Sequence, residues 1–154
     1  MADISKKRTW IWVAVISLLL VGMGVGVGIP LYRFLTAPEP PEVINITVQE
    51  VKEMIDDNVN YPNLIVLDIR LDFEYMTDHL EDSWWIPWNT TTLSYNGGEI
   101  ALNGYENIEI IVYCRTGSRS ASGSQFLVNA GFTEIYNMLG GIEAWRAAGY
   151  PTAT

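Results

Sequence analysis

The segment "IVYCRTGSRSASG" (residues 111–123) holds the only cysteine of the 154-residue chain. The run "IEIIVY" (residues 108–113) before it is apolar and rich in β-branched residues, which predicts a buried β-strand. The residues after Cys114 are small and polar, and they predict a loop followed by a helix over residues 118–131 that ends at a glycine. Cys114 is therefore expected at a junction between a strand and a helix.

Such a junction is suited to holding a negative charge. The first N–H groups of a helix have no partner within the helix, and the helix dipole favours an anion beside them. Gly117 allows the loop to curl, while Arg115 and Arg119 add permanent positive charge. We expect these surroundings to stabilise a nucleophilic Cys114 thiolate and to bind an anionic substrate or adduct. The alternative is an inert buried cysteine, which would have apolar neighbours on both sides.

Strands and helices alternate along the chain on both sides of this junction. The predicted strands cover residues 43–46, 64–69, 84–87, 108–113 and 133–138. The predicted helices cover residues 47–58, 70–80, 118–131 and 140–149. Residues 89–107 are rich in turn formers, with a candidate hairpin turn at residues 96–98. This order predicts an α/β fold with an open parallel sheet covered by helices on both faces, and chemistry at the carboxyl ends of the strands.

The charge is distributed unevenly along the chain. Residues 38–154 contain 17 acidic and five basic residues, a net charge of −12, whereas the whole chain carries −9. This excess argues against a nucleic-acid partner and against contact of residues 38–154 with an anionic membrane surface. The single cysteine excludes an internal disulfide. One cysteine and one histidine in the whole chain are too few ligands for a zinc site. We expect neither a metal nor another cofactor.

The N-terminal part predicts a membrane anchor. Residues 9–29 contain no ionisable side chain and as a helix would measure about 31 Å, the thickness of a bilayer core. With the flanking aromatic residues, the transmembrane helix is predicted over residues 9–32. A cleaved signal peptide is the alternative, but its apolar region is usually shorter, and residues 35–37 form a poor cleavage site.

These features divide the chain into a basic N-terminus (1–8), the transmembrane helix (9–32), a proline-rich link (33–43) and a folded domain (44–154). The positive residues before the helix predict a single-pass protein of the cell membrane whose N-terminus is cytoplasmic and whose folded domain is extracytoplasmic.

Two further patterns have two readings each. Gly22 and Gly26 have the spacing of a helix–helix contact in a lipid bilayer, although glycine is also common in membrane helices generally. Asn45 and Asn89 begin glycosylation sequons, which matter only if the domain is outside and the organism glycosylates; chance occurrence is the alternative.

Four segments together resemble a known family. They are "LDIRLDFEY" (67–75), "HLEDSWWIP" (79–87), "YCRTGSRS" (113–120) and "LGGIEAWRAAGYP" (139–151). Through them, residues 44–151 resemble the rhodanese family of single-domain sulfurtransferases. The resemblance implies an α/β rhodanese fold and a persulfide on Cys114. That persulfide would form from a sulfane donor such as thiosulfate and pass to a thiol or cyanide acceptor.

The resemblance also implies roles for individual residues. Cys114 would carry the sulfur, and the loop that cradles it would comprise Arg115, Thr116, Gly117, Ser118 and Arg119. Asp68 and Arg70 match positions that more often lock the structure than touch substrate, with a supporting role at the pocket left open. Glu74 and His79 would make capping or ion-pair contacts, and Arg146 would be a surface charge.

The sequence departs from the family pattern near residue 82. Asp82 stands where the family usually has glycine, and Trp85 stands where it has asparagine. Trp84, Trp85 and Trp88 predict an aromatic rim near the site. The alternative is that these side chains alternate into the core and that one of them is exposed.

Two other functions compete with sulfur transfer. A cysteine-dependent phosphatase or arsenate reductase would need five residues between its cysteine and arginine, but four separate Cys114 from Arg119. A non-catalytic binding module with the same fold would more naturally have lost its cysteine. Because the chain has one thiol, a persulfide on it must be discharged by an external acceptor.

Overall fold

The computed structural model describes residues 41–92, 94–95 and 100–154. Pro41–Thr154 form one compact unit. In the described residues, no helix has both the length and the apolar character needed to cross a bilayer. The transmembrane helix predicted over residues 9–32, the Gly22 and Gly26 contact within it and the hairpin turn predicted at residues 96–98 lie outside the described residues.

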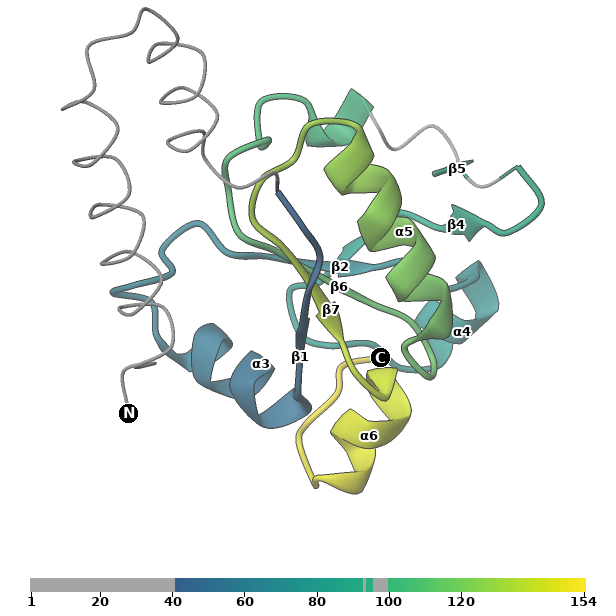
Figure 1. Ribbon diagram of the computed structural model, residues 1–154. Coiled ribbons are helices and arrows are strands. Elements are labelled where there is room, and N and C mark those ends of the chain that lie inside the picture. Colours follow the sequence, from purple (N-terminus) through teal and green to yellow (C-terminus); the bar gives the residue numbers. More distant parts are fainter. Residues whose placement is uncertain (1–40, 93, 96–99) are drawn as a thin grey trace, which may run out of the picture. The chain divides into compact units, whose positions relative to one another are not determined.

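A five-stranded parallel sheet organises this unit, in the spatial order β1-β7-β6-β2-β3 (Figure 1). Its strands are β1 (Ile44–Ile46), β2 (Ile65–Asp68), β3 (Trp84–Trp85), β6 (Ile110–Tyr113) and β7 (Ile135–Met138). The central strands β2 and β6 are buried along their whole length, which explains their continuous apolar runs. The predicted parallel sheet is confirmed.

Helices cover both faces of this sheet, as the alternation of strands and helices predicts (Figure 1). They are α3 (Val48–Asp56), α4 (Asp72–Thr77), α5 (Ser118–Asn129) and α6 (Gly141–Ala147). Helices α3 and α6 pack on one face, and α5 packs on the other. The capping box of α3 is present, because Glu50 accepts the Thr47 N–H at 2.7 Å and donates its own N–H to the Thr47 hydroxyl at 3.3 Å.

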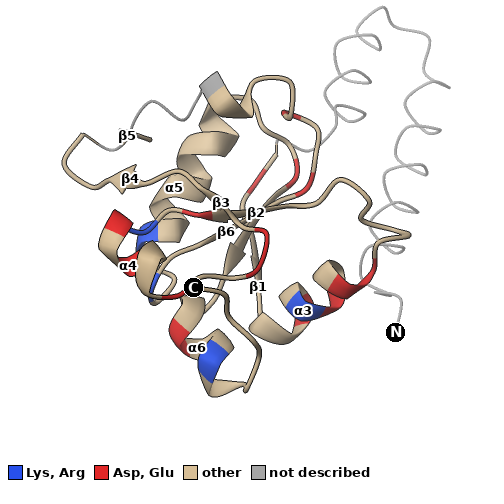
Figure 2. Cartoon of the chain, turned by 180° about the vertical axis from the view of Figure 1, so that it is seen from behind, with Lys and Arg blue, Asp and Glu red and all other residues tan. Residues whose placement is uncertain are grey.

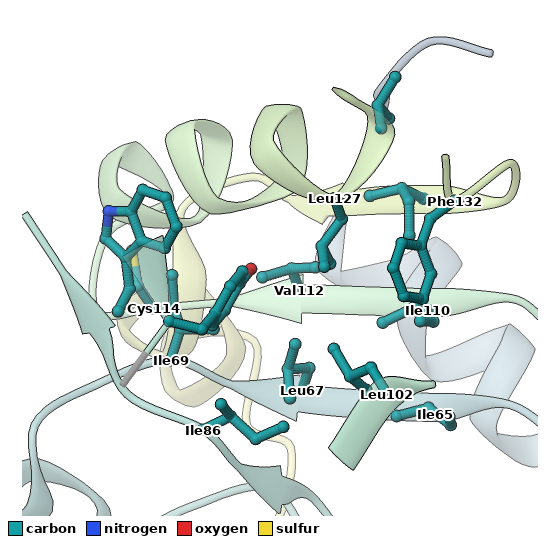
Figure 3. Packing of buried hydrophobic residues seen from close by; sticks show 14 residues of the cluster. Ile65, Leu67, Ile69, Ile86, Leu102, Ile110, Val112, Cys114, Leu127 and Phe132 are labelled. Carbon is teal, nitrogen blue, oxygen red and sulfur yellow. The ribbon is translucent and has the colours of Figure 1, made fainter. Parts of the chain in front are cut away.

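The alternation of side chains along β6 decides which face holds the cysteine. Ile110, Val112 and Cys114 belong to the apolar cluster beneath α5, together with Leu67 and Ile69 of the β2 segment (Figure 3). Ile111 and Tyr113 belong to the cluster on the opposite face, beneath α3 and α6. Because successive residues of a strand point to opposite faces, Cys114 lies on the α5 side.

The strand predicted over residues 84–87 is wrong in its extent. Strand β3 ends at Trp85, and a second short strand, β4 (Trp88–Asn89), pairs antiparallel with β5 (Ser94–Tyr95) in a separate two-stranded sheet. Pro87 lies between β3 and β4 and has no N–H to donate. The Asn89 side chain closes the turn after β4 by accepting the N–H groups of Thr91 and Thr92 at 2.8 and 3.0 Å.

The three tryptophans differ in exposure. Trp88 is 3% exposed, whereas Trp84 and Trp85 on the edge strand β3 are 38% and 41% exposed. The alternative in which one of the three is exposed is therefore wrong. Trp85 donates its indole N–H to the Arg70 carbonyl at 3.0 Å and stacks on Tyr75, whose ring centroid is 5.6 Å away.

Asp82 has a left-handed backbone, with φ of 57°, and is the one non-glycine residue with positive φ in the described residues. This conformation explains why glycine is usual at this position. Aspartate tolerates it better than most residues, because its short polar side chain can bond locally.

We predict that Asp82→Val lowers the free energy of unfolding by about 1–2 kcal/mol, because a β-branched side chain is strained in this conformation. Asp82→Gly should not lower it. Chemical denaturation measures both, and Glu81→Val, at the exposed neighbouring position, is the control. Equal stability of the valine and glycine variants at position 82 would contradict this account.

Candidate active site

Cys114 directly follows the last residue of β6 and is 1% exposed. Its sulfur has polar contacts on the side of the loop. The Gly117 N–H donates to Sγ at 3.2 Å, and the Ser120 hydroxyl lies 3.6 Å from it. The other side of the thiol faces the apolar cluster that contains Ile69 (Figure 3). The sulfur therefore lies between hydrogen-bond donors and hydrocarbon.

The loop contacts the sulfur through the Gly117 backbone rather than through the side chains of residues 115–119. Gly117 has φ of 93° and caps the N-terminus of α5, so the chain turns back over Cys114. Arg115, Thr116 and Ser118 are exposed. The N–H groups of the first turn of α5 have no partner within the helix, which gives this turn its affinity for negative charge.

The start of α6 supports this loop through a close backbone contact. The N–H of Ile142 donates to the Cys114 carbonyl at 2.9 Å, and the N–H of Glu143 donates to the Arg115 carbonyl at 3.1 Å. Gly141 makes this approach possible, since a Cβ atom at that position would lie 2.3 Å from the Cys114 carbonyl oxygen. The position of Cys114 thus depends on a glycine 27 residues further along the chain.

Arg119 forms a two-bond ion pair with Glu74 of α4. Its Nη1 and Nη2 atoms donate to the two carboxylate oxygens at 2.8 and 2.7 Å. These hydrogen bonds hold the pKa of Glu74 below its ordinary value of 4.5 and raise the pKa of Arg119. The guanidinium that the sequence suggests as an anion binder is therefore already bound to a carboxylate.

Arg115 also forms an ion pair with a carboxylate, but this pair is more exposed to solvent. Its Nε lies 3.0 Å from an oxygen of Glu143, and both side chains are about half exposed. Glu143 thus contacts Arg115 twice, once through its own N–H and once through its carboxylate.

Asp68 and Arg70 form a buried ion pair on the Tyr113 side of the sheet. An Arg70 Nη2 atom lies 2.7 Å from an Asp68 oxygen, and both side chains are almost fully buried. Burial alone would lower the pKa of Arg70, but the hydrogen bonds and charge of Asp68 raise it overall. The Arg70 guanidinium lies over the Tyr113 ring, 5.6 Å from its centroid. Because Tyr113 and Cys114 point to opposite faces, this pair braces the strand ends from the side away from the sulfur.

Glu74 makes the capping and ion-pair contacts expected of it. It accepts the Leu71 N–H at 3.1 Å at the start of α4, besides its pair with Arg119. Among the described residues His79 makes no ion pair, and its Nδ1 lies 3.1 Å from the Tyr75 carbonyl of α4. The His79 ring stacks on Tyr75 at 4.0 Å, and its backbone pairs with Ala153 near the C-terminus. Arg146 is half exposed and lies 3.3 Å from an oxygen of Asp78.

Two residues of the site were not predicted. Ser120 faces the sulfur from the first turn of α5, and its position in the run "RTGSRS" is the only sequence signal for this contact. Gly141 was recognised as part of a C-terminal segment, but its contact with the cysteine loop depends on tertiary packing. In the part of the chain that the structure describes, no three His, Cys, Asp or Glu side chains are grouped to bind a metal ion.

Comparison with known proteins identifies the family. The rhodanese-like domain family matches residues 47–148 of this chain. The chain therefore belongs to the rhodanese-like domain family.

One curated relative is similar over part of its length. A tRNA uridine(34) hydroxylase of Cronobacter sakazakii is 30% identical over 93 residues, which are 60% of this chain and 26% of that protein. The chain thus spans about a quarter of the length of this relative.

Two solved structures are similar in fold and sequence. A rhodanese-related protein from Thermoplasma volcanium has 27% identity and a TM-score of 0.57, over 71% of this chain and 97% of that one. A thiosulfate sulfurtransferase from Pseudomonas aeruginosa has 26% identity and a TM-score of 0.56, over 72% of this chain and 20% of that one.

We predict that Gly141→Ala lowers the free energy of unfolding by about 2–4 kcal/mol, because the new methyl group would collide with the Cys114 and Arg115 backbone. Gly149→Ala is the matched control. Gly149 also has positive φ, but a Cβ atom there meets nothing within 4 Å. Gly149→Ala should therefore lower the free energy of unfolding by only about 1 kcal/mol. Equal losses in denaturant titrations of the two variants would show that the contact with the loop is unimportant.

Proposed function

We propose that this protein is a sulfurtransferase that moves a sulfane sulfur from a donor such as thiosulfate to a thiol or cyanide acceptor through a persulfide on Cys114. The observation that carries the proposal is the Gly117 N–H, which donates to the Cys114 sulfur at 3.2 Å at the strand–helix junction. A backbone donor aimed at this sulfur can support the negative charge of a persulfide formed on it.

The reaction divides into two displacements. In the first, the Cys114 thiolate attacks the sulfane sulfur of the donor; a new S–S bond forms, and the donor leaves with the electron pair of its broken bond, as sulfite when it is thiosulfate. In the second, an acceptor thiolate or cyanide attacks the outer sulfur and releases the Cys114 thiolate. The amide groups of the first turn of α5 support the negative charge of the persulfide between these steps.

The alternatives are less well supported. The acidic excess of residues 38–154 speaks against a polyanionic RNA substrate such as the name of the Cronobacter sakazakii relative suggests, and the chain shares only a quarter of that protein. A phosphatase would need its loop arginine to bind the transferred phosphate, whereas Arg119 is bound to Glu74.

Intact-mass spectrometry tests the proposal directly. We predict that the full-length protein gains one sulfur atom after incubation with thiosulfate at high concentration or with the hydrodisulfide of 2-mercaptoethanol, and that cyanide removes it. Cys114→Ser is the control and should gain none. The proposal fails if neither donor adds sulfur to the wild-type protein, or if the serine variant gains the same mass.

We further propose that residues 9–32 anchor the protein in the cell membrane with the folded domain outside the cytoplasm. The support is the uncharged run of residues 9–29 and the three basic residues, Lys6, Lys7 and Arg8, just before it. We predict that a protease added to intact cells degrades the folded domain while a cytoplasmic marker survives. Protection of the domain in intact cells, with degradation after lysis, would reverse the proposed orientation.

A further inference from the structure

Every lysine and arginine in the described part of the chain has a nitrogen within 4.0 Å of a carboxylate oxygen. Figure 2 shows where the basic and acidic residues lie along the chain. The pairs are Lys52–Asp56, Arg70–Asp68, Arg115–Glu143, Arg119–Glu74 and Arg146–Asp78. The five basic residues beyond residue 37 are all among them. The described part of the folded domain therefore presents no unpaired lysine or arginine to an incoming anion.

This pairing bears most strongly on the cysteine loop. Its two guanidinium groups, on Arg115 and Arg119, face two carboxylates, on Glu143 and Glu74, so the four side chains carry no net charge. Both carboxylates come from elements outside the loop, α6 and α4. Hydrogen bonds from Arg119 lower the pKa of Glu74, so its carboxylate stays ionised at neutral pH.

Thiosulfate is poorly matched to this arrangement. It is a dianion, and its approach to a domain with a large acidic excess is unfavourable unless local cations attract it. An exposed apolar side chain lies beside Glu74, since Leu71, whose N–H the Glu74 carboxylate accepts at 3.1 Å, is 45% exposed. An apolar group on a donor would find contacts there that an inorganic dianion cannot use.

We propose that Glu74 and Glu143 determine the donor specificity of Cys114, by neutralising Arg119 and Arg115 so that organic hydrodisulfides are preferred to dianionic donors such as thiosulfate. This inference rests on the proposed sulfurtransferase function. The Cys114 thiolate attacks the outer sulfur of R–S–SH, the donor S–S bond breaks, and R–S⁻ leaves with the bonding pair and takes the proton. No additional oxidant or reductant is needed.

The test compares two donors on variants of the full-length protein. We predict that wild type has the higher kcat/KM for the hydrodisulfide of 2-mercaptoethanol than for thiosulfate. Glu74→Gln retains an oxygen that accepts a hydrogen bond from Arg119 but removes the negative charge. It should raise the ratio of kcat/KM for thiosulfate to kcat/KM for the hydrodisulfide about fivefold. Glu143→Gln should raise this ratio less, because its pair is more exposed.

Matched controls separate this effect from general damage. Glu81→Gln removes one negative charge at an exposed position outside these pairs and should leave the ratio unchanged. If Glu74→Gln does not fold, Glu143→Gln decides the question alone, since both members of its pair are half exposed.

The outcomes are distinguishable. The inference is overturned if wild type uses thiosulfate as efficiently as the hydrodisulfide, or if the glutamine variants leave the ratio unchanged or lower it. Failure of both donors to load Cys114 would instead refute the sulfurtransferase function itself.

Discussion

The active-site geometry depends on the contact between the Gly141 backbone and the carbonyl groups of Cys114 and Arg115. There is no space for a side chain at position 141, and the next two N–H groups of α6 donate to these carbonyls at 2.9 and 3.1 Å. Because peptide units in contact cannot shift independently, the loop is held at the residue that carries the thiol. The turn at Gly117 then directs its N–H at the sulfur.

On the other face of the sheet, ion pairs and a hydrogen bond connect α6 with the central strands β2 and β6. Asp78, after α4, receives Arg70 from the end of β2 and Arg146 from α6. The Tyr113 hydroxyl accepts the Leu80 N–H at 3.0 Å, which connects β6 to the segment after α4. The helix that supports the cysteine loop is thus tied to both central strands through side chains that do not touch the sulfur. This arrangement explains why Asp68 and Arg70 match the family although they lie on the opposite face.

Much of the fold could be predicted from the sequence, because its signals are local. The apolar runs of β2 and β6 and the Thr47–Glu50 capping box depend on residues close together in the chain. The face occupied by Cys114 could also have been read from its even spacing with Ile110 and Val112. The prediction of one strand over residues 84–87 is wrong because Pro87 has no N–H with which to continue the hydrogen bonds of β3. The chain beyond it pairs with β5 instead.

The candidate site was less predictable, because its charges are balanced over long distances in sequence. The cysteine, the glycine and the two arginines of the loop were recognisable together, but the partner of Arg119 lies 45 residues before it. The sequence shows how many charged residues are present, but it does not show which of them form ion pairs in the folded chain. A loop that looks strongly positive in the sequence is therefore electrically balanced once the chain is folded.

The burial of Cys114 has a kinetic consequence. With 1% of its surface exposed, the thiol meets a reagent only when the surrounding side chains move aside. A sulfur atom stored there would be shielded from water and from adventitious oxidants between loading and delivery. Under the proposed function, the same shielding would slow the access of a donor to the sulfur and favour donors small enough to pass between the surrounding side chains.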